Sequence, residues 1–309
     1  MRTWWVFGTC VLGTFLAASL TGACADDEGA AGSTQSTSSS VGLQGGGNPQ
    51  GGGTATSVGG GSVPPPPTEI AECQGHLYAC GDLQDNDMDG LIDYQDPDCL
   101  GPCDNTEDSY YGGIPGQNNA PCKADCYFDQ DSGAGNDDCY WSHQCDDHET
   151  APEYYPEPWN GATCAHDENA AIPGTTQGCA ELSMTQSQTC LDYCGPLTPN
   201  GCDCFGCCEL PAGTGNYVYL GSSDTSSQKC DIAHVNDPTV CHPCEVVPAC
   251  LNGCDTCELC IGKTVLPPEC DDPMGQQCGE GVQQCGLAGQ DPCPAGYYCI
   301  SGCCQALPQ

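Results

Sequence analysis

Five aspartates lie within the twelve residues 85 to 96, DNDMDGLIDYQD, and Gly90 stands sixth among them. A calcium ion in a twelve-residue loop takes oxygen ligands from alternate positions, needs a glycine at the sixth for a sharp turn, and is closed by a carboxylate at the twelfth. The spacing therefore predicts a calcium site. The predicted ligands are the side chains of Asp85, Asp87 and Asp89, the carbonyl of Leu91, Asp93 through a water, and Asp96 as the closing carboxylate.

The alternative is a solvated acidic turn that holds no metal. Carboxylates about 5 Å apart repel each other by roughly 0.8 kcal/mol per pair even in water, and several such pairs fall in this segment. The chain has 4 Lys+Arg against 42 Asp+Glu, so basic side chains cannot balance them. Repulsion between the carboxylates therefore favours the metal-bound interpretation. An exposed loop of this kind is expected to bind calcium weakly, with a Kd of about 10⁻⁴ to 10⁻³ M, as a structural ion.

The segment resembles the EF-hand loop, and more closely the dockerin and thrombospondin type 3 variants, in which Asp replaces the terminal Glu. Pro97 follows the closing position and disfavours a helical Asp96, so flanking helices are not expected. The resemblance to thrombospondin-type repeats implies that a disulfide between Cys80 and Cys99 braces the loop ends instead.

A second acidic stretch, DQDSGAGNDDC, has no such match. It is read either as a metal site or as an ordinary turn rich in Asp and Asn. Its candidate ligands are Asp129, Asp131, Asn136, Asp137 and Asp138.

The cysteine motifs allow three interpretations, which are structural disulfides, zinc binding and redox chemistry. The motifs are Cys204-x-x-Cys207, CHPC at 241–244 and CDTCELC at 254–260. Pro248 interrupts the helix that a redox CHPC needs, and no fourth cysteine lies close enough after Cys260 for an iron–sulfur run, so structural disulfides are favoured.

Catalytic signatures are missing: the sequence has no Gly-x-Ser-x-Gly, His-Glu-x-x-His or phosphate-binding glycine loop. His143 and His148, beside Cys145 and Asp147, could hold zinc, but surface histidines without metal are the favoured interpretation. Because carboxylates are so numerous, a secreted hydrolase, or a metal or redox enzyme using the CxxC clusters, stays open as the alternative function.

Composition decides what must hold such a chain together. Only 41 of 309 residues are Leu, Ile, Val or Phe, whereas 32 are Cys. We therefore predict a small disulfide-rich fold of loops and turns, with short strands and one or two short helices. The best helix candidate is 179–194 and the clearest strand is 215–221. The aromatic residues of 110–159 are expected to form most of the small core, with sugar or protein binding as the alternative.

The N-terminus predicts export. Residues 1–25 have a positive start, an apolar stretch and small residues for cleavage, as in a signal peptide, with an uncleaved membrane anchor as the alternative. TGAC resembles a bacterial lipobox and makes Cys24 a candidate for lipidation, although Thr21 stands where Leu is usual. Cleavage after Ala25 is the other possibility. Either cut leaves thirty cysteines, from Cys73 to Cys304, an even number that suits complete pairing in an oxidising compartment.

Beyond residue 25 the sequence divides into four regions. Residues 26–70 are a Gly/Ser/Pro-rich stretch without cysteine, expected to be a disordered tether. The others are the acidic and aromatic region 71–150, the cysteine-dense region 151–270 and a C-terminal disulfide knot, 271–309.

Taken together, the features resemble uncharacterised cysteine-rich surface lipoproteins of the myxobacterial type, which imply no activity. We expect an exported, lipid-anchored calcium-binding protein on the bacterial outer membrane or cell surface, or otherwise a secreted one, acting as a structural or interaction module. A cell-surface protein or glycan would be its partner, and only the lipid would touch the membrane. The net charge of −38 excludes nucleic acid.

Overall fold

The computed structural model describes most of the chain after residue 64, all of it within the unit Ser57–Gln309. The predicted signal peptide, Cys24 and nearly all of the tether lie outside the described residues. The described ranges are 65–110, 122–129, 137–148, 164–170, 176–222, 228–263, 266–267, 270 and 278–308.

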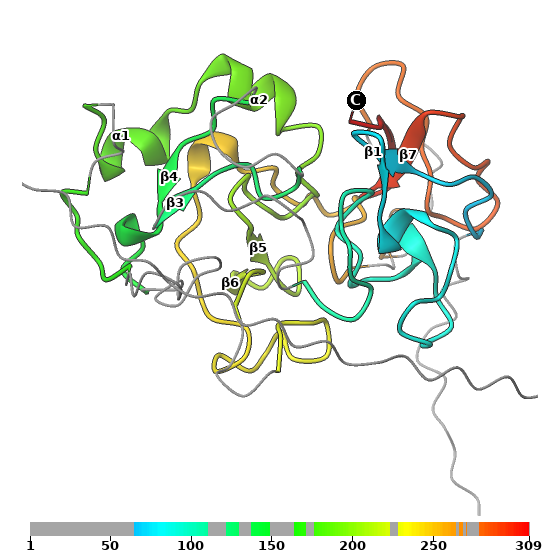
Figure 1. Ribbon diagram of the computed structural model, residues 1–309, viewed down its shortest axis with the longest axis horizontal. Helices are drawn as coiled ribbons and strands as arrows, with labels where there is room; N and C mark the ends of the chain where they lie inside the picture. Colours follow the sequence, from blue (N-terminus) through cyan, green and yellow to red (C-terminus); the bar gives the residue numbers. More distant parts are fainter. Residues whose placement is uncertain are drawn as a thin grey trace, which may run out of the picture. The chain divides into compact units, whose positions relative to one another are not determined.

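Four antiparallel two-stranded sheets are present in the described ranges. They are short hairpins rather than one continuous sheet, and the loops between them are long (Figure 1). Their strands are β1 (Glu72–Cys73) with β2 (His76–Leu77), β3 (Lys123–Ala124) with β4 (Trp141–Ser142), β5 (Cys207–Glu209) with β6 (Tyr217–Tyr219), and β7 (Tyr297–Ile300) with β8 (Cys303–Ala306). β6 confirms the strand predicted over 215–221.

The segment 179–194, predicted as one helix, forms two six-residue helices, α1 (Cys179–Met184) and α2 (Gln188–Tyr193). The single-helix prediction was wrong because the backbone is extended at Thr185, and Ser187 begins a new helix by accepting a hydrogen bond from the N–H of Cys190. Between the helices, Gln186 is buried and donates to the carbonyls of Leu182 and Tyr140. Four single-turn 3-10 helices complete the described secondary structure: η1 (Ala79–Gly81), η2 (Asp93–Gln95), η3 (His143–Cys145) and η5 (Pro248–Cys250).

Fifteen disulfides pair all thirty cysteines from Cys73 to Cys304, which confirms both complete pairing and the disulfide-rich fold class. Four of the bonds, among them Cys126–Cys194, join the 71–150 region to the 151–270 region. The three bonds of the 271–309 region are all internal, as in Cys285–Cys299.

The main core consists of disulfides and a few aromatic rings. Tyr110, Tyr127, Phe128 and Trp141 are buried there, which confirms the core role expected for the aromatic residues that the structure describes. Tyr111, Tyr154, Tyr155 and Trp159 lie outside the described residues. None of the described helices has the length and apolar character that a membrane span requires.

Buried aspartates replace part of the missing apolar core. Asp104 is fully buried and accepts hydrogen bonds from the N–H groups of Leu100 and Thr106. Asp203 is also fully buried and accepts from three backbone N–H groups. The backbone rather than a basic side chain therefore satisfies these two carboxylates, and the ion pairs of the described residues are those of His148 with Asp147 and His234 with Asp231.

Candidate metal site

The acidic loop, defined here as residues 85–96, has a tight conformation held by its own aspartates. Gly90 has a φ of 98°, which confirms the predicted sharp turn at the sixth position, and its N–H donates to Oδ2 of Asp85 at 3.1 Å. Oδ1 of Asp87 accepts from the N–H of Asp89 at 3.0 Å, and Oδ1 of Asp89 accepts from the N–H of Leu91 at 2.7 Å. Each of these three carboxylates is thus held at one oxygen.

Asp96 closes the loop, and its side chain is only 3% exposed. One oxygen, Oδ1, accepts a hydrogen bond from the N–H of Asp98 at 2.7 Å, whereas the buried Oδ2 has no hydrogen-bond partner. Burial, with smaller contributions from the negative charges of Asp89, Asp98 and Asp87, raises the pKa of Asp96 to about 7 despite that one hydrogen bond. The carboxylates of Asp87 and Asp89 thus act on a buried Asp96 that has one satisfied oxygen.

Neighbouring carboxylates also raise the pKa of a residue inside the loop. Burial raises the pKa of Asp87, and the carboxylates of Asp89, Asp85 and Asp108 add to this effect. The structure thus brings Asp85, Asp87, Asp89 and Asp96, four of the predicted ligands, into one electrostatically coupled group.

Asp93, the ninth residue of the loop, is placed differently. It is buried, and its Oδ1 lies 3.4 Å from the N–H nitrogen of Leu83. Burial raises its pKa to about 7, and the nearby carboxylates of Glu107 and Asp82 contribute. Its side chain therefore belongs to the base of the loop, where it lies close to groups outside the twelve residues.

Glu107, which lies outside the loop, holds the two ends of that base together. It is 2% exposed, and its two oxygens accept from the backbone N–H groups of Asn86, at 2.6 Å, and Asp93, at 2.8 Å. Burial raises its pKa. A buried carboxylate thus fixes the separation of residues 86 and 93, and with it the width of the loop.

Disulfides and Pro97 determine how the two ends of the acidic loop are held. Cys80 and Cys99 are bonded, which confirms the predicted brace, and Cys73–Cys103 lies further out. The backbone of Asp96 is extended, as expected for a residue before proline, so the single turn η2 inside the loop does not continue into a helix, and only the single turn η1 precedes the loop.

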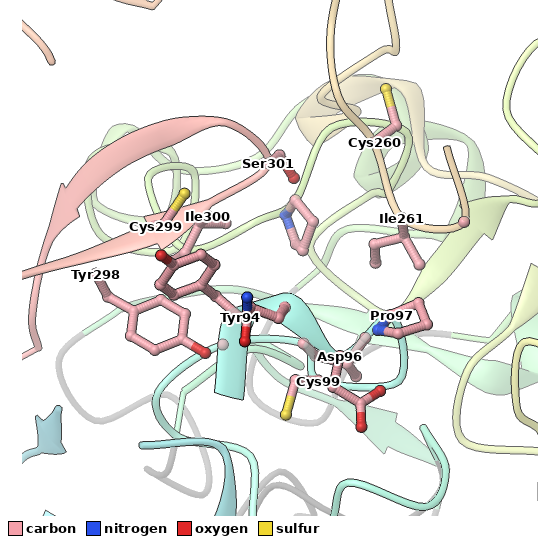
Figure 2. Close-up of a pocket in the computed structure, with 15 residues that line it drawn as sticks. Tyr94, Asp96, Pro97, Cys99, Cys260, Ile261, Tyr298, Cys299, Ile300 and Ser301 are labelled. Carbon is pink, nitrogen blue, oxygen red and sulfur yellow. The ribbon is translucent and has the colours of Figure 1, made fainter. Parts of the chain in front are cut away.

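Two hollows adjoin the loop. One, of about 580 Å³, is acidic, and its lining includes Asp82, Asp87, Glu107 and Asp108. The other, of about 90 Å³, is lined by Asp96 together with Tyr94, Pro97 and Ile300 of β7 (Figure 2). Of the predicted ligands, Asp87 lines the acidic hollow and Asp96 lines the smaller one, so both hollows border the loop.

The second acidic stretch is described only in part. Asp129 and Asp137 are buried with carboxylate oxygens within 4.8 Å of each other, and Asp138 is exposed. Asp131 and Asn136 lie outside the described residues. The structure adds Asp125, a buried carboxylate that acts on Asp137.

The cysteine motifs are fully oxidised. Cys204 pairs with Cys250, and Cys207 pairs with Cys244, so no bond forms within the CxxC of 204–207 or within CHPC. CDTCELC likewise contributes to two disulfides, Cys254–Cys260 and Cys257–Cys270. No sulfur of these motifs is a thiol in this structure, which agrees with the favoured structural interpretation.

The two histidines considered for zinc have different environments. His143 is buried with its ring 5.2 Å from that of Tyr219, and burial lowers its pKa to about 4. The expectation of a surface histidine was wrong here, because the ring is part of the aromatic core. His148 lies 3.7 Å from Asp147, and Cys145 is bonded to Cys179.

Sequence reasoning missed Glu107 and Asp98. Asp98 accepts a hydrogen bond from the N–H of Ile232 and lies near Asp87 and Asp89. The only sequence signal for either was acidity, as in the run around Glu107, and acidity is too common in this chain to be selective. No protein-family model, curated protein or solved structure matches the chain.

Proposed function

We propose that the protein is an exported, disulfide-stapled surface protein whose acidic loop binds a calcium ion, and that it acts as a structural or interaction module. Asp85, Asp87, Asp89 and Asp96 would supply carboxylate oxygens, together with the Leu91 carbonyl. The ion would stabilise the loop rather than take part in a reaction.

Asp96 carries this proposal. A buried carboxylate oxygen without a partner is costly, and neighbouring negative charges add to that cost. By contrast, the fully buried Asp104 accepts backbone hydrogen bonds on both of its oxygens. A cation would supply the partner that Asp96 lacks, and the carboxylates of Asp85, Asp87 and Asp89 are ligands of the kind that a hard ion such as calcium takes.

Calorimetric titration with calcium tests the site. We expect the wild type to bind with a Kd of about 10⁻⁴ to 10⁻³ M, and the Asp85→Ala/Asp89→Ala variant to lose this heat because two ligands are gone. Asp255→Ala/Asp291→Ala removes the same charge far along the sequence and should bind as the wild type does. Equal heats from the wild type and the loop variant would contradict the proposal.

Export is supported by the fifteen disulfides, which need an oxidising compartment to form and persist. Lipid anchoring through Cys24 is a separate part of the proposal. Cys24→Ser should move the protein from the membrane fraction to the soluble fraction, whereas Cys10→Ser, in the apolar stretch, should not. Membrane association that survives Cys24→Ser would contradict lipidation.

A further inference from the structure

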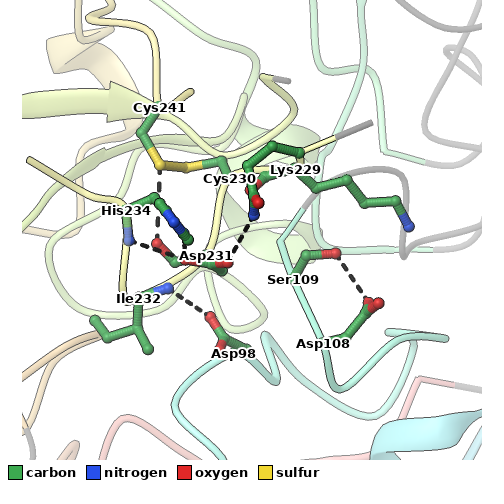
Figure 3. A network of polar contacts seen from close by, with 10 residues as sticks. Asp98, Asp108, Ser109, Lys229, Cys230, Asp231, Ile232, His234 and Cys241 are labelled. Carbon is green, nitrogen blue, oxygen red and sulfur yellow. Dashed lines mark hydrogen bonds and ion pairs between the residues drawn. A yellow bond between two sulfur atoms is a disulfide. The ribbon is translucent and has the colours of Figure 1, made fainter. Parts of the chain in front are cut away.

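A segment far along the chain contacts the acidic loop through Asp98, two residues beyond the loop. Oδ1 of Asp98 accepts a hydrogen bond from the N–H of Ile232 at 2.8 Å (Figure 3). A second bond runs alongside it, from the N–H of Tyr110 to the carbonyl of Cys230 at 2.8 Å. Cys230 is bonded to Cys241, so both contacts hold the disulfide loop 230–241.

This contact places like charges together. Asp231 lies next to Ile232, and its carboxylate acts on Asp98, as do those of Asp87 and Asp89 in the acidic loop. Lys229 extends away from Asp98 and Asp231 (Figure 3), and the ring of His234 lies against Asp231, with Nδ1 2.6 Å from its Oδ1. No described lysine forms an ion pair there, so the contact forms against repulsion.

Two buried polar atoms at this place lack partners. One is Oδ2 of Asp96, and the other is the hydroxyl oxygen of Tyr110, which is fully buried. Burial raises the pKa of Tyr110, and the carboxylates that also raise it are, in decreasing order of effect, Asp98, Asp231 and Asp96. The Tyr110 hydroxyl is a donor and needs an acceptor, whereas Oδ2 of Asp96 is a buried acceptor among carboxylates that a positive partner would stabilise.

We propose that the cation bound by the acidic loop also acts on Asp98 and Asp231, and that metal binding is thereby coupled to the docking of the disulfide loop 230–241. This inference rests on the proposed calcium site. The N–H of Asp98 donates a hydrogen bond to Asp96, the closing ligand, and the side chain of Asp98 accepts one from Ile232. Binding or release of the ion at Asp96 therefore affects the Asp98–Ile232 hydrogen bond through one short turn. By reciprocity, docking of the 230–241 loop also strengthens metal binding.

Calcium titration and hydrogen exchange of the full chain test this coupling. Asp98→Asn and Asp231→Asn remove one charge each and retain an acceptor oxygen. Each should weaken calcium binding about tenfold, the Coulomb effect of one carboxylate on a dication about 6 Å away in water. Asp237→Asn makes the same change elsewhere in the disulfide loop 230–241 and should leave the affinity within about twofold.

Hydrogen exchange of the wild type gives a readout that does not depend on any variant. Calcium should slow exchange in peptides covering 229–234, and the chelator should reverse the effect. Wild-type affinity retained by both variants, with no calcium effect on these peptides, would overturn the coupling and leave the calcium site intact. A wild type that binds no calcium would overturn both.

Discussion

At the scale of single residues, the aspartates divide into those satisfied by the backbone and those that face one another. Asp104 and Asp203 accept backbone hydrogen bonds on both oxygens, and each fixes a turn. Asp96 is equally buried but has one oxygen satisfied. Burial alone thus does not distinguish a structural carboxylate from a candidate ligand, whereas the count of its partners does.

Replacing Asp96 by Asn should therefore have opposite effects with and without metal. In chelator above about pH 7, Asp96→Asn should be more stable than the wild type by about 1 kcal/mol, because it removes an unpaired buried charge next to Asp89 and Asp98. Its calcium affinity should fall at least tenfold, because the closing carboxylate is lost. Denaturant unfolding with disulfides intact and calorimetry measure the two quantities.

Asp192→Asn is the control, since Asp192 is exposed on α2 and lies outside both the acidic loop and the hollows that adjoin it. This variant should leave both the stability in chelator and the calcium affinity close to the wild-type values. A loss of stability for Asp96→Asn in chelator would show that the carboxylate is stabilised in the metal-free protein, contrary to the structure.

At the scale of elements, part of the structure could be predicted from the sequence. The glycine at the sixth position and the proline after the twelfth fix local backbone conformation, so the turn at Gly90 and the extended Asp96 follow from residue types. β6 follows from its alternating pattern. The break between α1 and α2 does not, because it depends on the contact of Gln186 with Tyr140, which is distant in sequence.

Strand geometry also explains pairings that the sequence leaves open. Cys207 and Cys208 are neighbours in β5, and side chains of successive strand residues point to opposite faces. They accordingly pair with different partners, Cys244 and Cys202. Cys303 and Cys304 in β8 do the same. Strand geometry thus predicts that two neighbouring cysteines form disulfides on opposite faces of the strand, but which cysteine each one pairs with depends on the tertiary fold.

Asp203 ties β5 to the segment before η5, and this tie should depend on pH. One of its oxygens accepts from Phe205 and Cys207, the other from Val247. Burial raises its pKa from 3.8 to about 7 despite these bonds. A folded-state pKa above the unfolded one means that the folded protein binds the proton more tightly, so this contribution to stability is present at low pH and is lost as the pH rises through about 7.

We expect the free energy of unfolding, measured in chelator, to fall between about pH 4 and pH 7. Asp203→Asn should start lower, by about 1 to 3 kcal/mol, because its amide group cannot accept from Val247, but should show a shallower fall. Asp192→Asn, on the exposed face of α2, should retain the wild-type slope. An unchanged slope in Asp203→Asn would assign the pH dependence to other carboxylates.

At the scale of the whole molecule, disulfides and the proposed ion act over different ranges. Fifteen cross-links join segments throughout the described chain, as in Cys126–Cys194 with a sequence separation of 68. Each typically stabilises a fold by about 2 to 4 kcal/mol, mainly by restricting the unfolded chain. The ion would act on the acidic loop and, through Asp98, on residues 229–234.

Chelation and reduction should therefore have separable consequences. Chelation alone should speed hydrogen exchange only near residues 80–110 and 229–234, because the disulfides still hold the remaining segments. Reduction alone, with calcium present, should remove protection across all of the described ranges, since few apolar side chains remain to hold them. Protection that persists after both treatments would mean that the small aromatic core around Tyr127 and Trp141 is sufficient to hold the fold, which its size argues against.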